Sequence, residues 1–308
     1  MAAPANTYLS TAAIGNREDL SDIIYRISPS ETPYMSLADR NKAENTLHEW
    51  QTQDLAAPAA NAQAEGDDAA AVAVTPTVRL NNRTQISTKT VIVAGTQEAT
   101  KSAGRKSEMA YQMTLKSLEL KTDMEFALTR NNVTATAPRQ LRGLVGWVDS
   151  ANVSSGAGYV APNYVTNVAQ TDGTPRAFTE AMLKDVAQKV YSSGGNPDVL
   201  MLGPTQKQTF STFLGNSTRF DKGEDGKVYA ATDIYVTDFG ALKAVPNRIQ
   251  RSRDAFVLES EKHAVSYLRP FQKTPLAKTG DSEKMMLLAE YTLECRAPKA
   301  NGAVVDLT

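Results

Sequence analysis

The sequence predicts an α+β protein, and three observations support that fold class. Residues 104–130 contain no proline and no internal glycine, and apolar side chains recur there at helical spacing, which indicates one long helix. Residues 179–245 alternate between helix and strand patterns, which favours a compact α/β unit. From Met285 to Cys295 the odd positions are Met, Leu, Ala, Tyr, Leu and Cys, and this period of two is typical of a strand with one buried face.

The amino-terminal region predicts a short helix followed by an extended arm. Asn16 can cap a helix whose apolar stripe is Leu20, Ile23, Ile24 and Ile27. Ser28-Pro29 ends this helix and leads into an extended path. Three apolar side chains then follow in a stretch too short for a core of its own: Tyr34, Met35 and Leu37. They form either a local packing patch or an arm that docks on another surface, and both alternatives stay open.

An alanine-rich acidic loop is the least typical part of the chain. It covers residues 54–74, within a span without Phe, Tyr or Trp (51–110) and a span without Lys or Arg (43–78). Its few large apolar side chains cannot offset the conformational entropy of ordering it. Because strand patterns flank it at 46–52 and 75–94, we expect a long hairpin whose tip gains order only on a neighbouring subunit.

The long helix predicted over 104–130 would be about 40 Å long at 1.5 Å per residue. Its apolar stripe, expected to face the core, is Met109, Met113, Leu120, Met124 and Leu128. We interpret this methionine-rich stripe as core rather than as a cofactor site. Lys121 and Glu125 stand at i and i+4 and predict an exposed ion pair.

The remaining chain predicts a loop-rich stretch at 131–174, the α/β unit and a closing strand. Thr179 can cap the first helix of the unit, and Gly194-Gly195 closes it. The later elements expected in the unit are a strand at 199–202, a helix at 205–214 and strands at 228–236 and 242–245.

Length, charge and composition limit the kinds of protein that this sequence can be. The 308 residues are enough for two domains, and the formal net charge of −1 lacks the basic surplus of proteins that grip nucleic acid. The one basic cluster is interpreted as a solvated turn: Arg248, Arg251 and Arg253. Cys295 is the only cysteine, which favours a reducing compartment. No apolar run reaches 18 residues and the first residues lack a secretory pattern, so no membrane segment is expected.

Motifs that carry catalysis or bind cofactors are missing from the sequence. The two histidines, His48 and His263, lie far apart, and no G-x-S-x-G elbow accompanies them. No Cys/His cluster has the spacing of a zinc site. Gly156-x-Gly158 resembles a dinucleotide fingerprint but lacks the strand before it and the helix after it. We therefore expect no enzyme activity, no cofactor and no metal.

The order of these parts resembles the major capsid proteins of tailed bacteriophages, whose Hong Kong 97-type fold is shared with encapsulin nanocompartments. The segments AIGNREDLSDIIYRISPSETPYMSLADR, LHEWQTQDL and TPLAKTGDSEKMMLLAEYTLECR are similar to the major head proteins of podovirus-type phages. The divisions that the resemblance implies are an N-terminal arm (1–44), an E-loop hairpin with its flanking strands (45–95), a peripheral domain with a spine helix (96–150, helix 104–130), an axial domain (151–253) and return strands that complete the peripheral domain (254–308).

The resemblance implies self-assembly of pentamers and hexamers into an icosahedral head around double-stranded DNA. It places the protein in the virion capsid after assembly in the host cytoplasm, with weak non-specific contact to DNA and no membrane partner. The first 15 residues are too short for the scaffolding domain that some relatives carry, so either a separate scaffolding protein takes part or this is the mature chain. A portal is also implied as a partner. Some relatives weld the shell by a Lys–Asn bond from the E-loop. No lysine lies between Lys42 and Lys89, so we expect a non-covalent shell.

Three alternatives stay open at this point: an encapsulin-like cellular shell, a tail or decoration protein, and a soluble α/β enzyme. The acidic loop tip, Glu65, Asp67 and Asp68, is expected to meet basic groups of another subunit near the start of the long helix. The full set of candidate interface residues is Tyr34, Met35, Leu37, Trp50, Leu55, Glu65, Asp67, Asp68, Lys101, Arg105 and Lys106.

Overall fold

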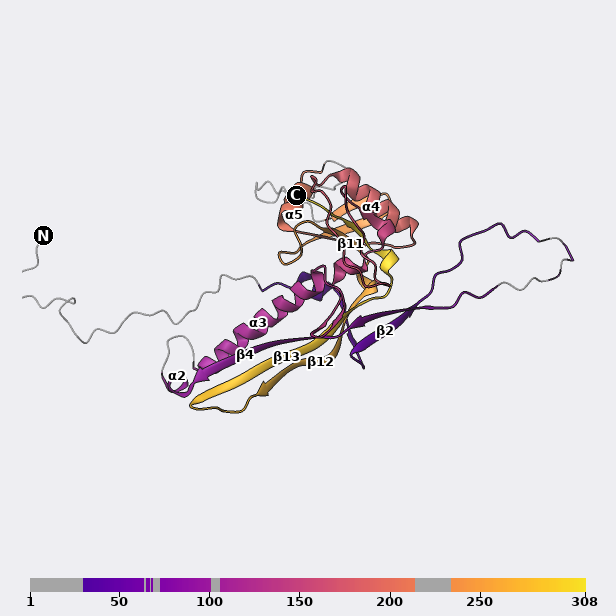
Figure 1. Cartoon of the computed structure of the whole chain (residues 1–308). Helices are drawn as coiled ribbons and strands as arrows, with labels where there is room; N and C mark the ends of the chain where they lie inside the picture. The colour runs from indigo at the N-terminus through magenta and orange to yellow at the C-terminus, as the bar shows by residue number, and fades with distance from the viewer. Residues whose placement is uncertain (1–29, 64, 67, 69–72, 101–105, 214–233) are drawn as a thin grey trace, which may run out of the picture.

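The computed structural model describes residues 30–63, 65, 66, 68, 73–100, 106–213 and 234–308. Figure 1 shows a long, narrow body built on helix α3 and a rounder body around helix α4, with a loop that projects beyond both. The predicted helix at 16–27 lies outside the described residues, as does most of the predicted strand at 228–236. No helix among the described residues is long and apolar enough to cross a membrane.

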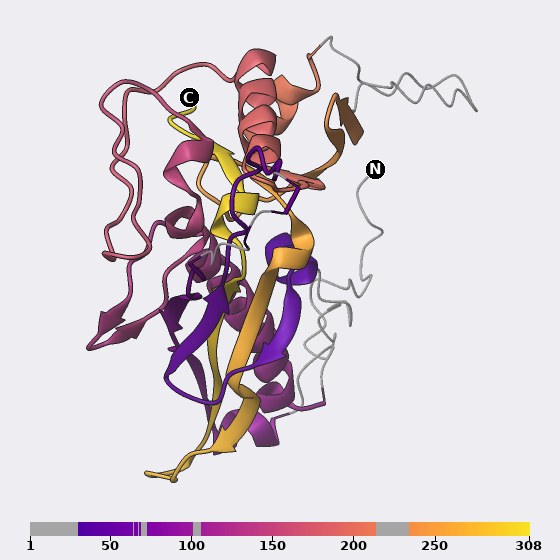
Figure 2. The ribbon, with the colours of Figure 1, turned by 90° about the vertical axis from the view of Figure 1, so that its right-hand side faces the viewer.

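The narrow body is a four-stranded sheet with α3 along one face. The strands, in spatial order, are β1 (Asp39–Lys42), β12 (His263–Pro275), β13 (Ser282–Cys295) and β4 (Gln85–Ala94). β12, β13 and β4 are antiparallel neighbours, while β1 of the arm runs parallel to β12 (Figure 2). The predicted closing strand is therefore confirmed, and it lies in the middle of this sheet.

Helix α3 (Glu108–Thr129) confirms the predicted long helix but begins at Glu108 rather than at residue 104. Ser107 is its cap, because the Ser107 side chain accepts a hydrogen bond from the Ala110 amide. The whole predicted stripe is buried: Met109, Met113, Leu120, Met124 and Leu128. The predicted Lys121–Glu125 surface pair is wrong, because Glu125 lies one residue beyond Met124 on the buried side of the helix.

The rounder body is a six-stranded sheet with α4 (Glu180–Ser192) and α5 (Pro204–Phe210). Its strands, in order, are β7 (Val153–Ser154), β14 (Gly302–Val304), β11 (Ala255–Leu258), β8 (Val199–Leu202), β10 (Gly240–Pro246) and β9 (Ile234–Thr237). The prediction that all strands after residue 254 join the peripheral sheet is wrong for β11 and β14. All four residues of β11 are apolar and buried, so this strand fits the interior of the second sheet, beside β8.

The predicted hairpin around the loop consists of β2 (Leu47–Thr52) and β3 (Val78–Arg83), paired antiparallel. The single strand expected over 75–94 is divided at Thr84 into β3 and β4. The Thr84 amide donates to the carbonyl of Thr46, and its hydroxyl donates to Glu290 at 3.0 Å. The chain therefore leaves the hairpin at Thr84 and pairs with β13 instead.

The second face of β13 is also buried, which corrects the expectation of one buried face. Glu290, Thr292 and Glu294 are at most 6 % exposed. Glu290 forms ion pairs of 2.7 Å with Arg139 and with Arg269. Strand periodicity alone does not reveal such a buried polar face, because the partners come from elsewhere in the chain.

Candidate functional site

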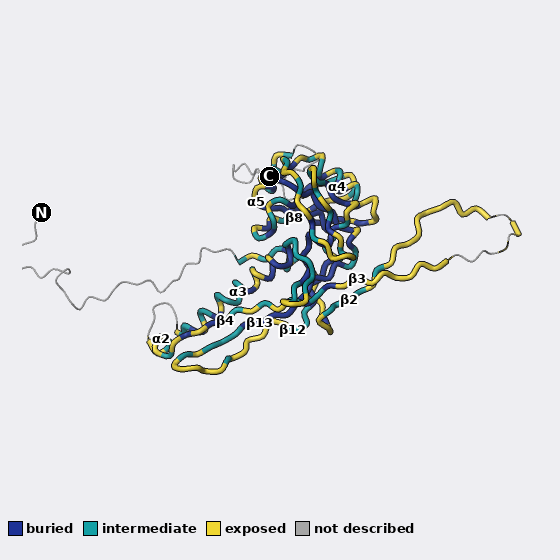
Figure 3. The backbone as a smooth tube through the Cα atoms, viewed as in Figure 1, coloured by how far each residue is buried: buried dark blue, intermediate teal, exposed yellow. Residues whose placement is uncertain are grey.

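The loop between β2 and β3 is the most exposed part of the described chain. Every described residue from 53 to 77 is exposed, as the yellow excursion in Figure 3 shows. Leu55 is 96 % exposed and Val74 is 89 % exposed. Exposed leucine and valine side chains on a long arm are costly in water and favour a contact with another molecule.

The root of this loop is held by a row of packed aromatic rings. Ring centroids are 5.7 Å apart from His48 to Trp50, 5.3 Å from Trp50 to Trp147 and 5.9 Å from Trp147 to Tyr164. The Trp50 indole N–H donates to the carbonyl of Cys295 at 2.9 Å. Trp50 was a candidate interface residue, but these contacts engage it within its own subunit. The loop is thus an exposed segment on a well-packed base.

Glu294 joins the loop root and the arm to the central strand β13. Its carboxylate accepts hydrogen bonds from His48 Nε2 (2.9 Å), Ser266 Oγ (2.9 Å) and Asn41 Nδ2 (3.1 Å). Burial alone would raise the pKa of Glu294, but these donors and Arg296 outweigh it and lower that pKa to about 2. Glu294 therefore stays ionised at physiological pH and holds β1, β2 and β12 to its own strand, β13.

The arm is packed into its own subunit at α1 (Pro33–Leu37). Tyr34 is fully buried, and its hydroxyl lies 2.9 Å from Nδ1 of His263. The other ring nitrogen of His263, Nε2, lies 2.8 Å from Oδ1 of Asn301. Asn301 Oδ1 can only accept, so Nε2 of His263 carries the proton and Nδ1 accepts from Tyr34. The prediction of Tyr34 as an interface residue is wrong. Met35 and Leu37 are half-buried against the same core.

Glu125 fastens the arm to the spine helix and to the second sheet. Its carboxylate accepts hydrogen bonds from the backbone amides of Tyr34 (2.8 Å) and Met35 (2.9 Å) and from Asn247 Nδ2 (2.7 Å). Asn247 follows directly after β10. Burial raises the pKa of Glu125, while the three donors act in the opposite direction. One carboxylate therefore connects three parts of the subunit.

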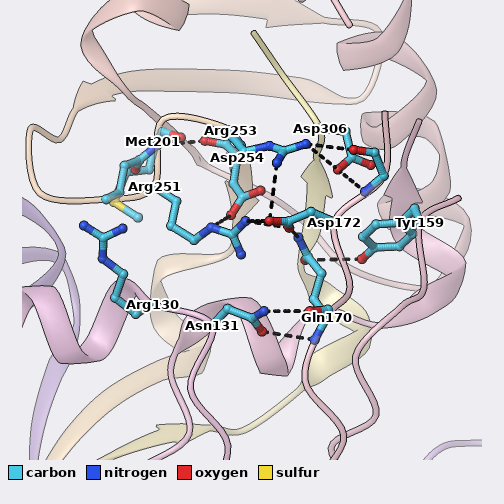
Figure 4. A network of polar contacts seen from close by, with 12 residues as sticks. Arg130, Asn131, Tyr159, Gln170, Asp172, Met201, Arg251, Arg253, Asp254 and Asp306 are labelled. Atoms are coloured by element: carbon cyan, nitrogen blue, oxygen red, sulfur yellow. Dashed lines mark hydrogen bonds and ion pairs between the residues drawn. The ribbon is translucent and has the colours of Figure 1, made fainter. Parts of the chain in front are cut away.

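A network of polar contacts connects Asn131, just after α3, through Gln170 to charged residues beside the second sheet (Figure 4). Arg251 binds both carboxylate oxygens of Asp172, at 2.5 and 2.6 Å, and its side chain is 11 % exposed. Arg253 donates to the carbonyl of Gly173 at 2.8 Å and lies 3.5 Å from Asp306. The interpretation of this basic cluster as a solvated turn is therefore wrong for Arg251 and Arg253. The loop that carries Asp172 supplies acidic partners that are distant in sequence.

Asp254 makes this junction sensitive to pH. Its side chain is fully buried, and its Oδ2 lies 3.3 Å from Arg251 Nε. Burial raises the pKa of Asp254 to about 6, and Asp172 and Asp306 add to this while Arg251 opposes it. Because the folded-state pKa is above the unfolded value, the favourable contribution is complete below about pH 4 and is lost as the pH rises through about 6.

We expect Asp254→Asn to raise the free energy of unfolding at pH 8 by about 1–2 kcal/mol and to have little effect at pH 4. The amide keeps the shape of the side chain and removes the cost of a buried charge. Urea titration of the dissociated subunit at both pH values measures this. Asp172→Asn is the matched control with the opposite sign, because bonds from Arg251 and Gln170 outweigh burial and lower the pKa of Asp172. An Asp254→Asn subunit that is less stable than the native one at pH 8 would contradict the prediction.

Comparison with known proteins identifies the architecture. A family model described as SU10 major capsid protein matches residues 5–308. The chain belongs to the SU10 major capsid protein family. The major capsid protein of Escherichia phage Phieco32 is 26 % identical to this chain over an alignment of 334 positions, which covers 94 % of each chain. This phage major capsid protein is therefore a structural component of the virion capsid and not an enzyme.

Solved structures show the same fold in other phage capsids. The cyanophage A-1(L) capsid asymmetric unit matches with a TM-score of 0.65 and 13 % identity, covering 97 % of this chain and 98 % of that one. The structure titled Phage G gp27 major capsid proteins and gp26 decoration proteins matches with a TM-score of 0.57 and 10 % identity, covering 96 % and 99 %. The expected Hong Kong 97-type α+β fold is confirmed.

The predicted interface residues of this capsid protein do not form one cluster. Leu55, Glu65 and Asp68 lie on the exposed loop, and Lys106 is exposed just before α3. Asp67, Lys101 and Arg105 lie outside the described residues. The loop and the start of α3 project to opposite ends of the subunit (Figure 1), so the expected pairing between them concerns two copies and stays a prediction.

Sequence reasoning missed the anchoring carboxylates. Glu125 had a usable signal, because it stands between Met124 and Leu128 of the predicted buried stripe. Glu294 had none, because strand alternation placed it on the face expected to be exposed. Within the described ranges, no group of three or more His, Cys, Asp or Glu side chains could hold a metal ion.

Proposed function

We propose that this capsid protein assembles as pentamers and hexamers into an icosahedral shell around double-stranded DNA, and that contacts of the N-terminal arm and the E-loop hold the shell. The exposed loop at 53–77 carries this proposal. It presents Leu55 and Val74 almost completely to solvent on a base fixed by packed aromatic rings. Such an arrangement suits a segment that is completed by an adjacent copy.

The loop contact combines low individual affinity with high total stability. A segment that gains order only on its neighbour loses conformational entropy at each contact, so each contact is weak and errors can dissociate. A closed shell repeats the contact around every capsomer, so the complete particle is stable. In the proposed division, residues 151–253 meet their copies around the axes and residues 96–150 form the periphery with β12 and β13.

The proposed shell is non-covalent. No lysine lies between Lys42 and Lys89, so the exposed loop has no amine to form an isopeptide bond. We infer further that a separate scaffolding protein and a portal take part, and that assembly occurs in the host cytoplasm. The net charge of −1 favours weak, non-specific contact with packaged DNA rather than a tightly bound genome.

Electron microscopy of the purified chain tests the proposal. We expect spherical particles, tubes or capsomer rings, and we expect these to dissociate into single chains of 33.3 kDa when boiled in detergent without reductant. A monodisperse monomer at high concentration would contradict assembly. Particles that resist detergent as cross-linked chains would contradict the non-covalent shell. Particles purified from infected cells that hold cargo protein instead of DNA would favour the encapsulin-like alternative.

A further inference from the structure

Arg142 is a buried cation beside the root of the exposed loop. The residue is 2 % exposed, and burial lowers the pKa of its guanidinium to about 10, so the side chain stays charged at neutral pH. The guanidinium donates to two uncharged oxygens, the carbonyl of Tyr164 at 2.5 Å and Oδ1 of Asn167 at 2.7 Å. It also lies 5.0 Å from the centre of the Trp147 ring. Burying a cation costs free energy, which neutral acceptors and a ring offset only through a well-defined geometry.

The backbone of Arg142 is fixed to the loop root. Its amide donates to Oδ1 of Asn82 at 2.8 Å, and Nδ2 of Asn82 donates to the carbonyl of Arg142 at 3.1 Å. Asn82 lies in β3, opposite His48 of β2, and its Nδ2 also donates to the carbonyl of Leu293 in β13 at 2.8 Å. Arg142 is therefore joined directly to the hairpin from which the exposed loop projects.

The side chain of Arg142 holds a second hairpin, residues 160–171, at its turn. Asn167 in this turn has a positive φ of 58°, a conformation that asparagine tolerates. Its Oδ1 also accepts from the amide (2.9 Å) and the hydroxyl (2.8 Å) of Thr134, and its Nδ2 donates to the Thr134 carbonyl at 2.9 Å. The turn is therefore clamped between Arg142 and Thr134, although Val165 within it is 73 % exposed.

The second hairpin and the loop root share a groove of about 310 Å³. Val78 and Leu80 of β3 line this groove together with Tyr164 and Val165 of the second hairpin. Val78 is 55 % exposed, so closing the groove would bury apolar surface on both hairpins. The hydrophobic effect thus draws the loop root toward the second hairpin. Arg142 opposes this movement, because it fixes the turn of the second hairpin in place.

A glycine leaves the space that the Arg142 side chain occupies. Gly146 lies in the 3₁₀ helix η2 (Leu144–Trp147). A Cβ at residue 146 would lie 2.7 Å from Cγ and 2.8 Å from Cδ of Arg142. Packed atoms do not approach this closely, so a larger residue at this position would displace the arginine side chain. Gly146 is therefore part of the same positioning device.

We propose that Arg142 is a positioning residue for assembly: it locks the second hairpin against the loop root and thereby sets the direction in which the exposed loop leaves the subunit. This inference rests on the proposed function, because the direction of the loop matters where the loop meets an adjacent copy. A fixed direction gives every copy the same contact angle, so shells close with one curvature. A variable direction gives shells of mixed size.

The direction of the loop root can be measured in the dissociated subunit, without assembly. Spin labels are attached at Arg79→Cys in β3 and at Thr166→Cys in the turn of the second hairpin; both positions are exposed, and native Cys295 is buried. We expect a narrow distance distribution in the labelled chain and an about twofold broader one after Arg142→Met, which removes the guanidinium fork. Arg176→Met is the matched control, because Arg176 is half-buried in the rounder body. Equal widths in the three chains overturn the inference.

Particle size gives a second measurement, in the assembled protein. Arg142→Met should about double the spread of diameters in electron micrographs, whereas Arg176→Met should keep the native diameters even where it lowers the yield. A residue that only stabilises the fold would change the yield and not the diameters.

Gly146→Ala keeps the charge of Arg142 and displaces its side chain, so it should broaden both the label distances and the diameters. This variant decides the outcome where Arg142→Met does not fold. Native label distances and diameters in the folded variants overturn this inference alone, and so does a failure of both variants to fold, which would make Arg142 a residue of the fold. A native chain that stays monomeric overturns the proposed function instead.

Discussion

Glu125→Ala should lower the free energy of unfolding of the subunit by about 3–5 kcal/mol. The substitution removes the acceptor of three hydrogen bonds, from the amides of Tyr34 and Met35 and from Asn247. These donors are buried or half-buried, so water does not fully replace the lost carboxylate. The loss should therefore exceed that of a typical surface substitution several times over.

Urea titration of the dissociated subunit, followed by the fluorescence of Trp50 and Trp147, measures this effect. Glu119→Ala is the matched control, because Glu119 lies on the same helix and its side chain is 43 % exposed. Its ion pairs with Lys89 and Lys116 are at the surface, so its loss should be within about 1 kcal/mol. Glu125→Gln keeps one acceptor oxygen and should fall between the two. Equal losses for Glu125→Ala and Glu119→Ala would show that Glu125 does not anchor the arm.

The arm should also respond to the same change, because α1 is fixed through its backbone at Glu125. Released from that carboxylate, Tyr34 loses the orientation that directs its hydroxyl to His263. Limited proteolysis should then cut near residues 30–38 faster in Glu125→Ala than in Glu119→Ala. This links stability to assembly, since the same arm is one of the segments proposed to hold the shell.

Local periodicity was sufficient to predict the long helix, the closing strand, and α4, α5, β8 and β10 of the α/β unit. Those signals depend on neighbours one or two turns away in the chain, so they are readable without tertiary information. The predicted helix start at residue 104 was too early, because Ser107 caps the helix by accepting a hydrogen bond from the Ala110 amide. Element boundaries depend on such single contacts.

Features fixed by distant contacts were not predictable in the same way. The division of one strand pattern at Thr84 depends on Glu290, more than 200 residues later. The burial of Glu290 and Glu294 depends on Arg139, Arg269 and His48, which come from three other segments. Alternation of apolar and polar residues identifies the two faces of a strand, but it does not show whether other segments also bury the polar face.

The candidate site likewise contains features that the local sequence predicts and features that depend on distant contacts. Composition alone predicted the exposed loop, because too few apolar side chains lie within it to order it. Tyr34 was mispredicted, and the interface role of Trp50 stays a prediction, because an aromatic side chain beside an extended segment fits its own core or a neighbour equally well by sequence. Only the contacts with His263 and Trp147 distinguish these two positions.

Replacing residues 53–77 with a two-residue Asn-Gly turn should abolish assembly and leave the subunit folded. Thr52 and Val78 are the last paired residues of the hairpin, so a tight turn can join them directly. The loop has about 25 residues, and shortening it should lower the entropy cost of closing the hairpin by about 2 kcal/mol. The subunit should therefore become no less stable while it loses the segment that contacts its neighbour.

Sedimentation and electron microscopy measure assembly, and urea titration of the same preparations measures folding. A second variant replaces residues 54–74 with a glycine-serine segment of equal length, which keeps the reach of the loop and removes Leu55, Glu65 and Val74. If side chains make the contact, both variants stay unassembled; if the loop only spaces the subunits, the glycine-serine chain assembles. Normal shells from the shortened chain would refute the role of the loop altogether. The described loop residues bury little surface in their own subunit, so the shortened chain should lose assembly without losing stability. A misfolded variant would instead lose both stability and assembly.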